Sequence, residues 1–273
     1  MFGNGLLLDL HISIVWKLMI IAPWPALCSN GLASDYAVNC FQASITLLIF
    51  TGITSLSLFI YRMKAATNYV EHAPLQRIAV SLRNVFLVCS CFTIMLTIAV
   101  YPDLKKQKIY KQKMSDSLGT LPGYMWCDNC FFMQFDSWIF VVFYITAYCS
   151  VMSAFISGAL AATETIMSLN SKSLRLSAKT AAIQKNFIFS LCVAITVHLT
   201  LIFVPLGWYF FANLVRQDFQ YIPSLIVTML QNHGSMSTLT MLITNNLLRR
   251  SVKKLFLAPE NILCGAEPKL NGN

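Results

Sequence analysis

Long apolar runs separated by short polar connections dominate the pattern of hydrophobic and polar positions along this chain. The runs fall at about residues 6–22, 38–61, 84–101, 137–163, 186–215 and 222–248. A helix needs about 20 apolar residues to cross a bilayer core, so the pattern predicts six membrane-spanning helices. The first run includes Lys17, whose ammonium can reach an interface along its flexible stem.

The last apolar run has a polar middle and ends at a basic segment. On a helix, His233 and Ser237 lie one turn apart and can bond each other. Residues 249–257 are predicted to form a juxtamembrane helix on the anionic leaflet. A second polar stripe is predicted to face other helices rather than lipid. It consists of Thr228, Gln231, Asn232, Ser235, Thr238 and Asn246.

The composition is that of a multi-pass membrane protein. Hydrophobic residues make up 56% and charged residues 11% of the chain, whereas soluble domains have about 25% charged residues. The net charge of +9 is carried by connections between apolar runs, which argues against nucleic-acid binding. The distribution of basic residues predicts a cytoplasmic carboxyl terminus. We therefore expect one membrane domain over residues 1–257 and a disordered cytoplasmic tail over residues 258–273.

Four cysteines lie at the face of the membrane that this orientation places outside: Cys28, Cys40, Cys127 and Cys130. An oxidising compartment permits a disulfide there. The preferred pair joins Cys40 to Cys127 or Cys130, and a different pairing or unpaired thiols remain open. A zinc site is not predicted, because Cys127 and Cys130 alone supply too few ligands.

Several short motifs resemble those of the nematode serpentine chemoreceptors, class H. The run HGSMSTLTML at 233–242 resembles the His-Gly-x-x-Ser-Thr signature of that family's last helix. SAKTAAIQKNF at 177–187 resembles its inner segment before the sixth helix, and LDLHISIVWKLMIIAPWPAL resembles its second helix. The resemblance implies an all-α membrane protein with a rhodopsin-like serpentine bundle and no cofactor. Six of the seven transmembrane helices would be present and the first absent.

The same resemblance implies a chemosensory G-protein-coupled receptor that detects a small external molecule and signals to a heterotrimeric G protein. Its location would be the plasma membrane or a sensory cilium. The residues implied to face the G protein are Arg62, Lys179, Lys185, Arg249 and Arg250. Three departures concern coupling. Leu247 and Leu248 replace the family's Pro-Tyr before Arg249, and Ile60 and Tyr61 replace its Glu-Asn before Arg62. Ala194 stands where a glutamine is expected.

Polar residues inside apolar runs are the candidate site, since they are costly in lipid unless they face the bundle. They are predicted to contact a ligand or to bond other helices, and these alternatives stay open; they are Gln231, Asn232, His233, Ser237 and His198.

Pro205 and Gly234 are predicted hinge positions. Arg62 is expected to be an interfacial anchor, to face a G protein or to lock neighbouring helix ends. The aromatic residues Trp138, Tyr144 and Tyr148 are interpreted as interface belt or core.

Other function classes fit less of the sequence. Catalysis is not predicted, because no paired acids, Ser/His/Asp set or metal-binding constellation is present. Two alternatives fit the six-span pattern: a channel or transporter subunit with both termini cytoplasmic, and a truncated, non-signalling member of the family.

Overall fold

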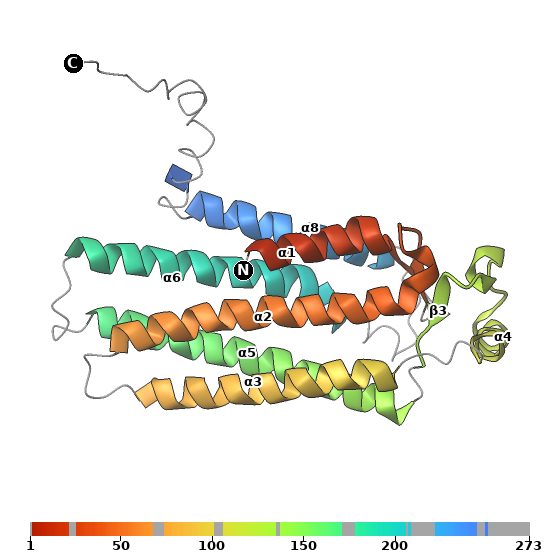
Figure 1. Cartoon of the computed structure of the whole chain (residues 1–273), viewed down its shortest axis with the longest axis horizontal. Helices are drawn as coiled ribbons and strands as arrows, with labels where there is room; N and C mark the ends of the chain where they lie inside the picture. The colour runs from red at the N-terminus through yellow and green to blue at the C-terminus, as the bar shows by residue number, and fades with distance from the viewer. Residues whose placement is uncertain are drawn as a thin grey trace, which may run out of the picture.

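The computed structural model describes residues 2–21, 26–67, 74–100, 106–134, 137–170, 178–205, 207–208, 222–244 and 249–250. Long helices lie side by side, with neighbours in the chain running in opposite directions (Figure 1). They are α1 (Phe2–Leu10) continued by the π-helix η1 (His11–Trp16), α2 (Ala37–Thr67), α3 (Pro74–Ala99), α5 (Trp138–Asn170), α6 (Ala178–His198) continued by the π-helix η4 (Leu199–Phe203), and α8 (Ile222–Thr244).

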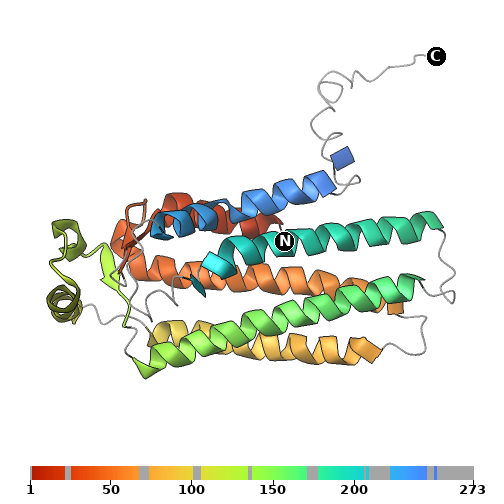
Figure 2. The same ribbon diagram turned by 180° about the vertical axis from the view of Figure 1, so that it is seen from behind.

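The helix bundle has two distinct ends. One, here named the sheet end, carries a small β-sheet and the helix α4 (Gln107–Leu118); the opposite end is named the far end. In both views the amino terminus lies about halfway along the bundle, where α1 begins (Figures 1 and 2). Four helical segments in the described part are long and apolar enough to cross a membrane: Ser34–Thr67, Pro74–Ala99, Trp138–Asn170 and Thr180–Phe203.

The first apolar run does not form the predicted span over residues 6–22. Its helix ends at Trp16, and Lys17 adopts a left-handed conformation with φ of 49°. The following loop returns against the helix end, because the amides of Leu32 and Ala33 donate to the carbonyls of Ile14 and Val15. A Cβ at Gly31 would lie 2.4 Å from the carbonyl oxygen of Val15, so only glycine permits this turn.

A three-stranded antiparallel sheet, which the sequence did not predict, covers the sheet end. It comprises β1 (Leu18–Ile21), β2 (Ala26–Ser29) and β3 (Cys130–Phe132), in the order β1-β2-β3. Gln107 continues the ladder with its side chain: its amide accepts from the Phe132 N–H at 2.9 Å and donates to the Phe132 carbonyl at 3.2 Å. The short helix η3 (Gly123–Trp126) precedes β3 in the chain and contacts it. The sheet, η3 and α4 together are named the cap.

α3 and α5 form the most extensive helix pair. Hydroxyls join them in the bundle interior: Ser90 and Ser150 are 2.8 Å apart, and Ser157 donates to the Ala79 carbonyl at 2.7 Å. At the far end, the buried carboxylate of Glu164 accepts from the Leu75 N–H, 3.2 Å away, in the first turn of α3. A carboxylate at a helix amino terminus is favourable, because it accepts from N–H groups that have no partner within the helix.

These features confirm the predicted all-α serpentine bundle, with the small sheet as an addition. The described part of the predicted juxtamembrane helix is limited to Arg249 and Arg250, which are helical and exposed. Residues 251–257 and the predicted tail lie outside the described residues.

Candidate functional site

An elongated cavity of about 380 Å³ lies among α2, α3, α5, α6 and η4. It extends along the bundle from Phe41 and Phe143 near the sheet end to Phe59 towards the far end. Its wall is mainly aliphatic and aromatic, with hydroxyls as the main polar groups. None of the described residues that line it is an Asp, Glu, Lys, Arg or His. Such a wall can enclose a small molecule through apolar contact and a few hydrogen bonds.

Apart from the cavity, a buried polar cluster joins α1 to α8. The carboxylate of Asp9 lies 2.9 Å from Nδ1 of His233, a side chain with 0% exposure. Asp9 also accepts from the backbone N–H groups of Gly234 and Ser235, at 3.1 and 2.8 Å. A buried charge needs such a set of donors to offset its lost hydration.

His233 Nδ1 is protonated in this arrangement. It lies 2.7 Å from the Leu230 carbonyl as well as 2.9 Å from Asp9, and both neighbours are acceptors. A ring nitrogen between two acceptors has to carry the hydrogen. The pair therefore joins α1 to the middle of α8 through the hydrogen on Nδ1.

Gly234 is required for this contact. A Cβ there would lie 2.6 Å from Asp9 Oδ2 and 2.7 Å from the Gly5 carbonyl. The glycine thus lets α1 approach the backbone of α8, which is a different reason for its presence from the predicted hinge. The hinge role itself stays a prediction.

The predicted inward stripe of α8 is wrong for its described members, and Asn246 lies outside the described residues. Thr228, Asn232 and Ser235 are exposed, and Gln231 and Thr238 are only partly buried. The helix instead buries Ile226, Leu230, His233, Ser237 and Met241. The sequence pattern favoured the face of the helix that carries more polar residues. The face that carries His233 points inward instead, because the buried carboxylate of Asp9 on α1 needs a hydrogen-bonding partner.

Polar residues proposed as a site therefore separate into three places. His233 and Ser237 are buried in α8. Gln231 and Asn232 are not among the residues that line the cavity, and the Asn232 amide donates to the Thr228 carbonyl of its own helix. His198 is the last residue of α6, and its side chain lies outside the described part.

At the far end, Arg62 on α2 contacts α6. Its Nη1 donates to the Gln184 side-chain oxygen at 3.0 Å, and its guanidinium lies 4.5 Å from the centre of the Phe187 ring. Only arginine can hydrogen-bond an amide and stack on an aromatic face at once, because its guanidinium is planar and forked whereas lysine presents only a point charge. Among the predicted roles of Arg62, this geometry matches a contact that locks helix ends.

Other basic residues predicted to face a partner lie at the same end. The Lys185 ammonium donates to the Asn170 side chain, joining α6 to the last residue of α5. Arg249 and Arg250 are exposed beyond α8. Lys179 lies in the first turn of α6, and its side chain is outside the described part.

Pro205 is buried and lies two residues after the end of the π-helix η4. Proline has no N–H to donate, so the preceding turn loses a regular hydrogen bond. A widened turn at this place is where a helix can change direction. The predicted hinge at Pro205 thus has a local irregularity beside it, and its motion stays a prediction.

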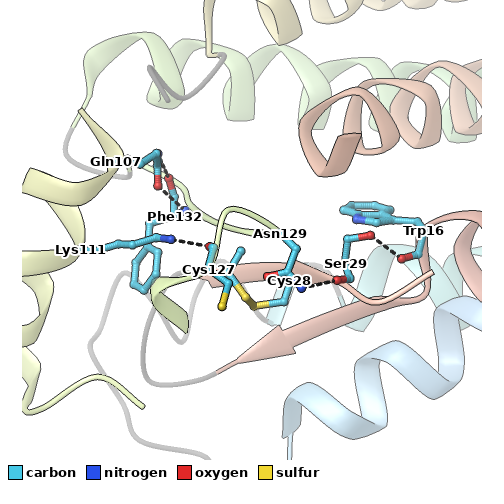
Figure 3. Close-up of a disulfide and its surroundings, with 9 residues drawn as sticks. Trp16, Cys28, Ser29, Gln107, Lys111, Cys127, Asn129 and Phe132 are labelled. Atoms are coloured by element: carbon cyan, nitrogen blue, oxygen red, sulfur yellow. Dashed lines mark hydrogen bonds between the residues drawn. A yellow bond between two sulfur atoms is a disulfide. The ribbon is translucent and has the colours of Figure 1, made fainter. Parts of the chain in front are cut away.

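The sheet end is closed by a disulfide between Cys28 on β2 and Cys130 on β3 (Figure 3). The preferred pairing with Cys40 is wrong: Cys40 and Cys127 are free thiols, and Cys40 is buried at the start of α2. Cys28 and Cys130 are directly opposite each other in the antiparallel ladder. The sheet, which the sequence did not predict, therefore selects the partner.

Lys111 of α4 points into this cap and is only 2% exposed. Its ammonium donates to the Cys127 carbonyl at 2.9 Å, as Figure 3 shows. Burial lowers the pKa of the Lys111 amine from its ordinary value of 10.5, and the nearby Asp128 carboxylate opposes that shift. The cap is thus held by one covalent bond and one buried cation.

Sequence reasoning missed three parts of this arrangement. Asp9 was visible as an acid inside an apolar run, but nothing in the sequence identified its partner 224 positions away. Tyr144 and Tyr148 were interpreted as belt or core, yet both line the cavity. Gln184 belongs to the motif at 177–187, and its contact with Arg62 depends on the fold.

A membrane bundle of antiparallel helices with an interior cavity, an interhelical contact at one end and a disulfide-bonded cap at the other has the architecture of a serpentine receptor. Residues 4–258 match the family described as serpentine type 7TM GPCR chemoreceptor Srh. The chain belongs to this family of chemoreceptors and is a multi-pass membrane protein, as the class H resemblance indicated. No curated protein and no solved structure matches the chain.

Proposed function

We propose that the protein is a chemosensory receptor that binds a small external molecule and signals to a heterotrimeric G protein. The receptor lies in the plasma membrane. Its sheet end faces outside and its far end faces the cytoplasm. Family membership supports the receptor class. The excess of basic residues in the connections at the far end supports the orientation.

The observation that carries the proposal is the position of the cavity relative to Arg62. The cavity lies between α2, α5 and α6, and Arg62 joins α2 to α6 at the far end. A ligand that changes the spacing of these helices therefore alters the geometry of the Arg62 contact. Ligand binding would favour a state in which this contact is open, by differential affinity for the two states.

The far end offers a basic surface to a partner. Arg249 and Arg250 are exposed there, and Lys185 holds α6 to α5. Opening the Arg62 contact would free its guanidinium and the Gln184 amide for a G protein. Lys179 belongs to the same proposed surface by its place in the sequence.

The test uses Gln184→Ala in the purified receptor, reconstituted in lipid nanodiscs with heterotrimeric G proteins. The substitution removes the acceptor for Arg62 and leaves the Phe187 ring in place. We expect faster ligand-independent uptake of a non-hydrolysable GTP analogue than with the unaltered receptor. Gln112→Ala is the matched control, because this glutamine is exposed on α4 in the cap.

A folded Gln184→Ala variant that stimulates no G-protein class above the unaltered receptor would contradict the lock. Folding is checked by the thermal unfolding midpoint. Ion or solute flux through the same protein in liposomes, without any G-protein response, would identify the channel or transporter alternative instead.

A further inference from the structure

The wall of the cavity determines the charge of its ligand. Several hydroxyls of the wall already donate to the backbone of their own helix: Thr51 to Leu47, Ser55 to Thr51, and Thr196 to Cys192. None of the described wall residues is an Asp, Glu, Lys, Arg or His that could pair with an ion. An ion transferred into such surroundings would lose its hydration without compensation. The wall therefore fits an uncharged molecule.

Packed aromatic rings close the cavity towards the sheet end. The Phe41 ring lies 6.3 Å from Trp16, 6.2 Å from Phe131 and 6.5 Å from Phe143, measured between ring centres. Phe131 belongs to β3, which the disulfide ties to β2. This layer lies between the cavity and the cap.

The seam between α5 and α6 is more open. Tyr148 and Phe155 on α5 line the cavity and are 46% and 44% exposed. Thr196 on α6 also lines the cavity and is exposed. α5 and α6 contact each other sparsely, in contrast to the extensive α3–α5 pair. The cavity wall along this seam is thus incompletely covered by neighbouring helices.

We propose that the cavity takes a small, uncharged, lipid-soluble molecule that reaches it sideways from the bilayer, between α5 and α6. The ring contact of Tyr148 with Phe203, 5.7 Å between centres, limits this opening on its sheet-end side. A volume of 380 Å³ is at the small end of ligand pockets, which span about 300–1,000 Å³. The inference rests on the proposed function, because it treats the cavity as the receptor's ligand site.

The first experiment measures occupancy without any G protein. The purified receptor in phosphatidylcholine nanodiscs is illuminated with the neutral photolabel 3-phenyl-3-(trifluoromethyl)diazirine, and labelled residues are located by mass spectrometry. We expect labelling of interior wall residues such as Ser55 and Ala154 that is lost when an excess of unlabelled competitor of similar structure is added. The para-carboxylate of the same label should give no such saturable signal.

Two matched variants separate the cavity from the outer surface. Ala154→Phe places a ring in the cavity and should abolish the saturable labelling. Ala99→Phe makes the same change at an exposed position of α3 that does not line the cavity, and should retain the signal. Equal labelling by the carboxylate, or saturable labelling that survives Ala154→Phe in the folded protein, would overturn the ligand class.

The second experiment tests the route. A phospholipid with a diazirine at the end of one acyl chain cannot leave the bilayer, so it reaches interior wall residues only through a lateral opening. We expect crosslinks at Ser55 that are lost in Thr196→Phe and kept in Thr200→Phe, an exposed position one turn away that does not line the cavity. Crosslinks confined to outward side chains, while the free label marks the interior, would overturn the lateral route.

These measurements are independent of signalling. Saturable neutral labelling without any G-protein response would leave the cavity inference standing and reject the proposed function. The opposite pattern, a response to Gln184→Ala without saturable labelling, would reject the cavity inference alone.

Discussion

The carboxylate of Asp9 in α1 lies 2.9 Å from the His233 imidazole in α8 and accepts two backbone N–H groups from the same helix. Because both side chains are buried, this contact fixes the height of α1 against α8. The position of the shortest helix in the bundle thus depends on one polar cluster rather than on apolar packing alone.

Replacing Asp9 by Asn should destabilise the protein strongly. The amide cannot satisfy His233 and both N–H groups of α8 as the carboxylate does, and loss of one partner of a buried pair costs about 3–5 kcal/mol. Thermal unfolding of Asp9→Asn, His233→Gln and the double variant would measure the coupling, expected at about 0.5–3 kcal/mol. Strictly additive effects of the two substitutions would contradict a direct contact.

Gly234→Ala should lower stability by about 1–3 kcal/mol through crowding. The added methyl would meet Asp9 and the Gly5 carbonyl below 3 Å, so α1 has to move away from α8. Gly207→Ala is the control, because nothing lies within 4 Å of a Cβ built there. Equal unfolding midpoints for the two variants would show that α1 does not approach α8 as described.

Removing the disulfide with Cys28→Ser should lower stability by roughly 2–5 kcal/mol, since the bond closes a loop of about 100 residues. Cys127→Ser removes an exposed free thiol from the same cap and should leave the unfolding midpoint unchanged. Reductant should lower the midpoint of the unaltered protein and of Cys127→Ser, but not that of Cys28→Ser. If reductant lowered the midpoint of the unaltered protein but not that of Cys127→Ser, the disulfide would involve Cys127 instead.

Lys111 should make the stability of the cap depend on pH. Its pKa is lowered in the folded protein by burial, so the unfolded chain binds more protons between that lowered value and 10.5. Stability contributed by this group therefore rises with pH over that window.

The measurement compares the unaltered side chain with Lys111→Met, both in the Cys127→Ser background, from about pH 7 to about pH 9.5. The unfolding midpoint with lysine should rise relative to that with methionine as pH increases. A difference that is constant, or that falls with pH, would show that Lys111 is not buried as a costly cation.

The helical bundle could be predicted from the sequence because apolar runs of spanning length report directly on the bilayer. The structure of residues 17–21 and 26–29 could not, since a short apolar stretch suits a helix end or a strand equally. Its outcome depends on Gly31, which lets the loop bond the end of η1, and on the distant partner strand β3. The error in the disulfide has the same origin, because ladder register decides which cysteine meets Cys130.

Residues of the candidate site could be predicted where a polar or charged side chain is energetically costly to place in its apolar surroundings. His233 in an apolar run indicated a buried polar contact, and Arg62 at a helix end indicated an interhelical or interfacial role. Their partners, Asp9 and Gln184, are distant in sequence, and single-helix periodicity does not say which helices are neighbours. The cavity was unpredictable for the same reason, because its wall consists of ordinary apolar residues from separate helices.

The side chain of Gln107 also affects how copies of the receptor meet in a crowded membrane. A strand at the margin of a sheet presents bare N–H and C=O groups that can recruit a strand from another molecule. On β3, Gln107 occupies both backbone groups of Phe132, at the margin that faces away from β2. Neighbouring copies therefore cannot join their caps into a continuous ladder through Phe132 unless this glutamine is displaced first.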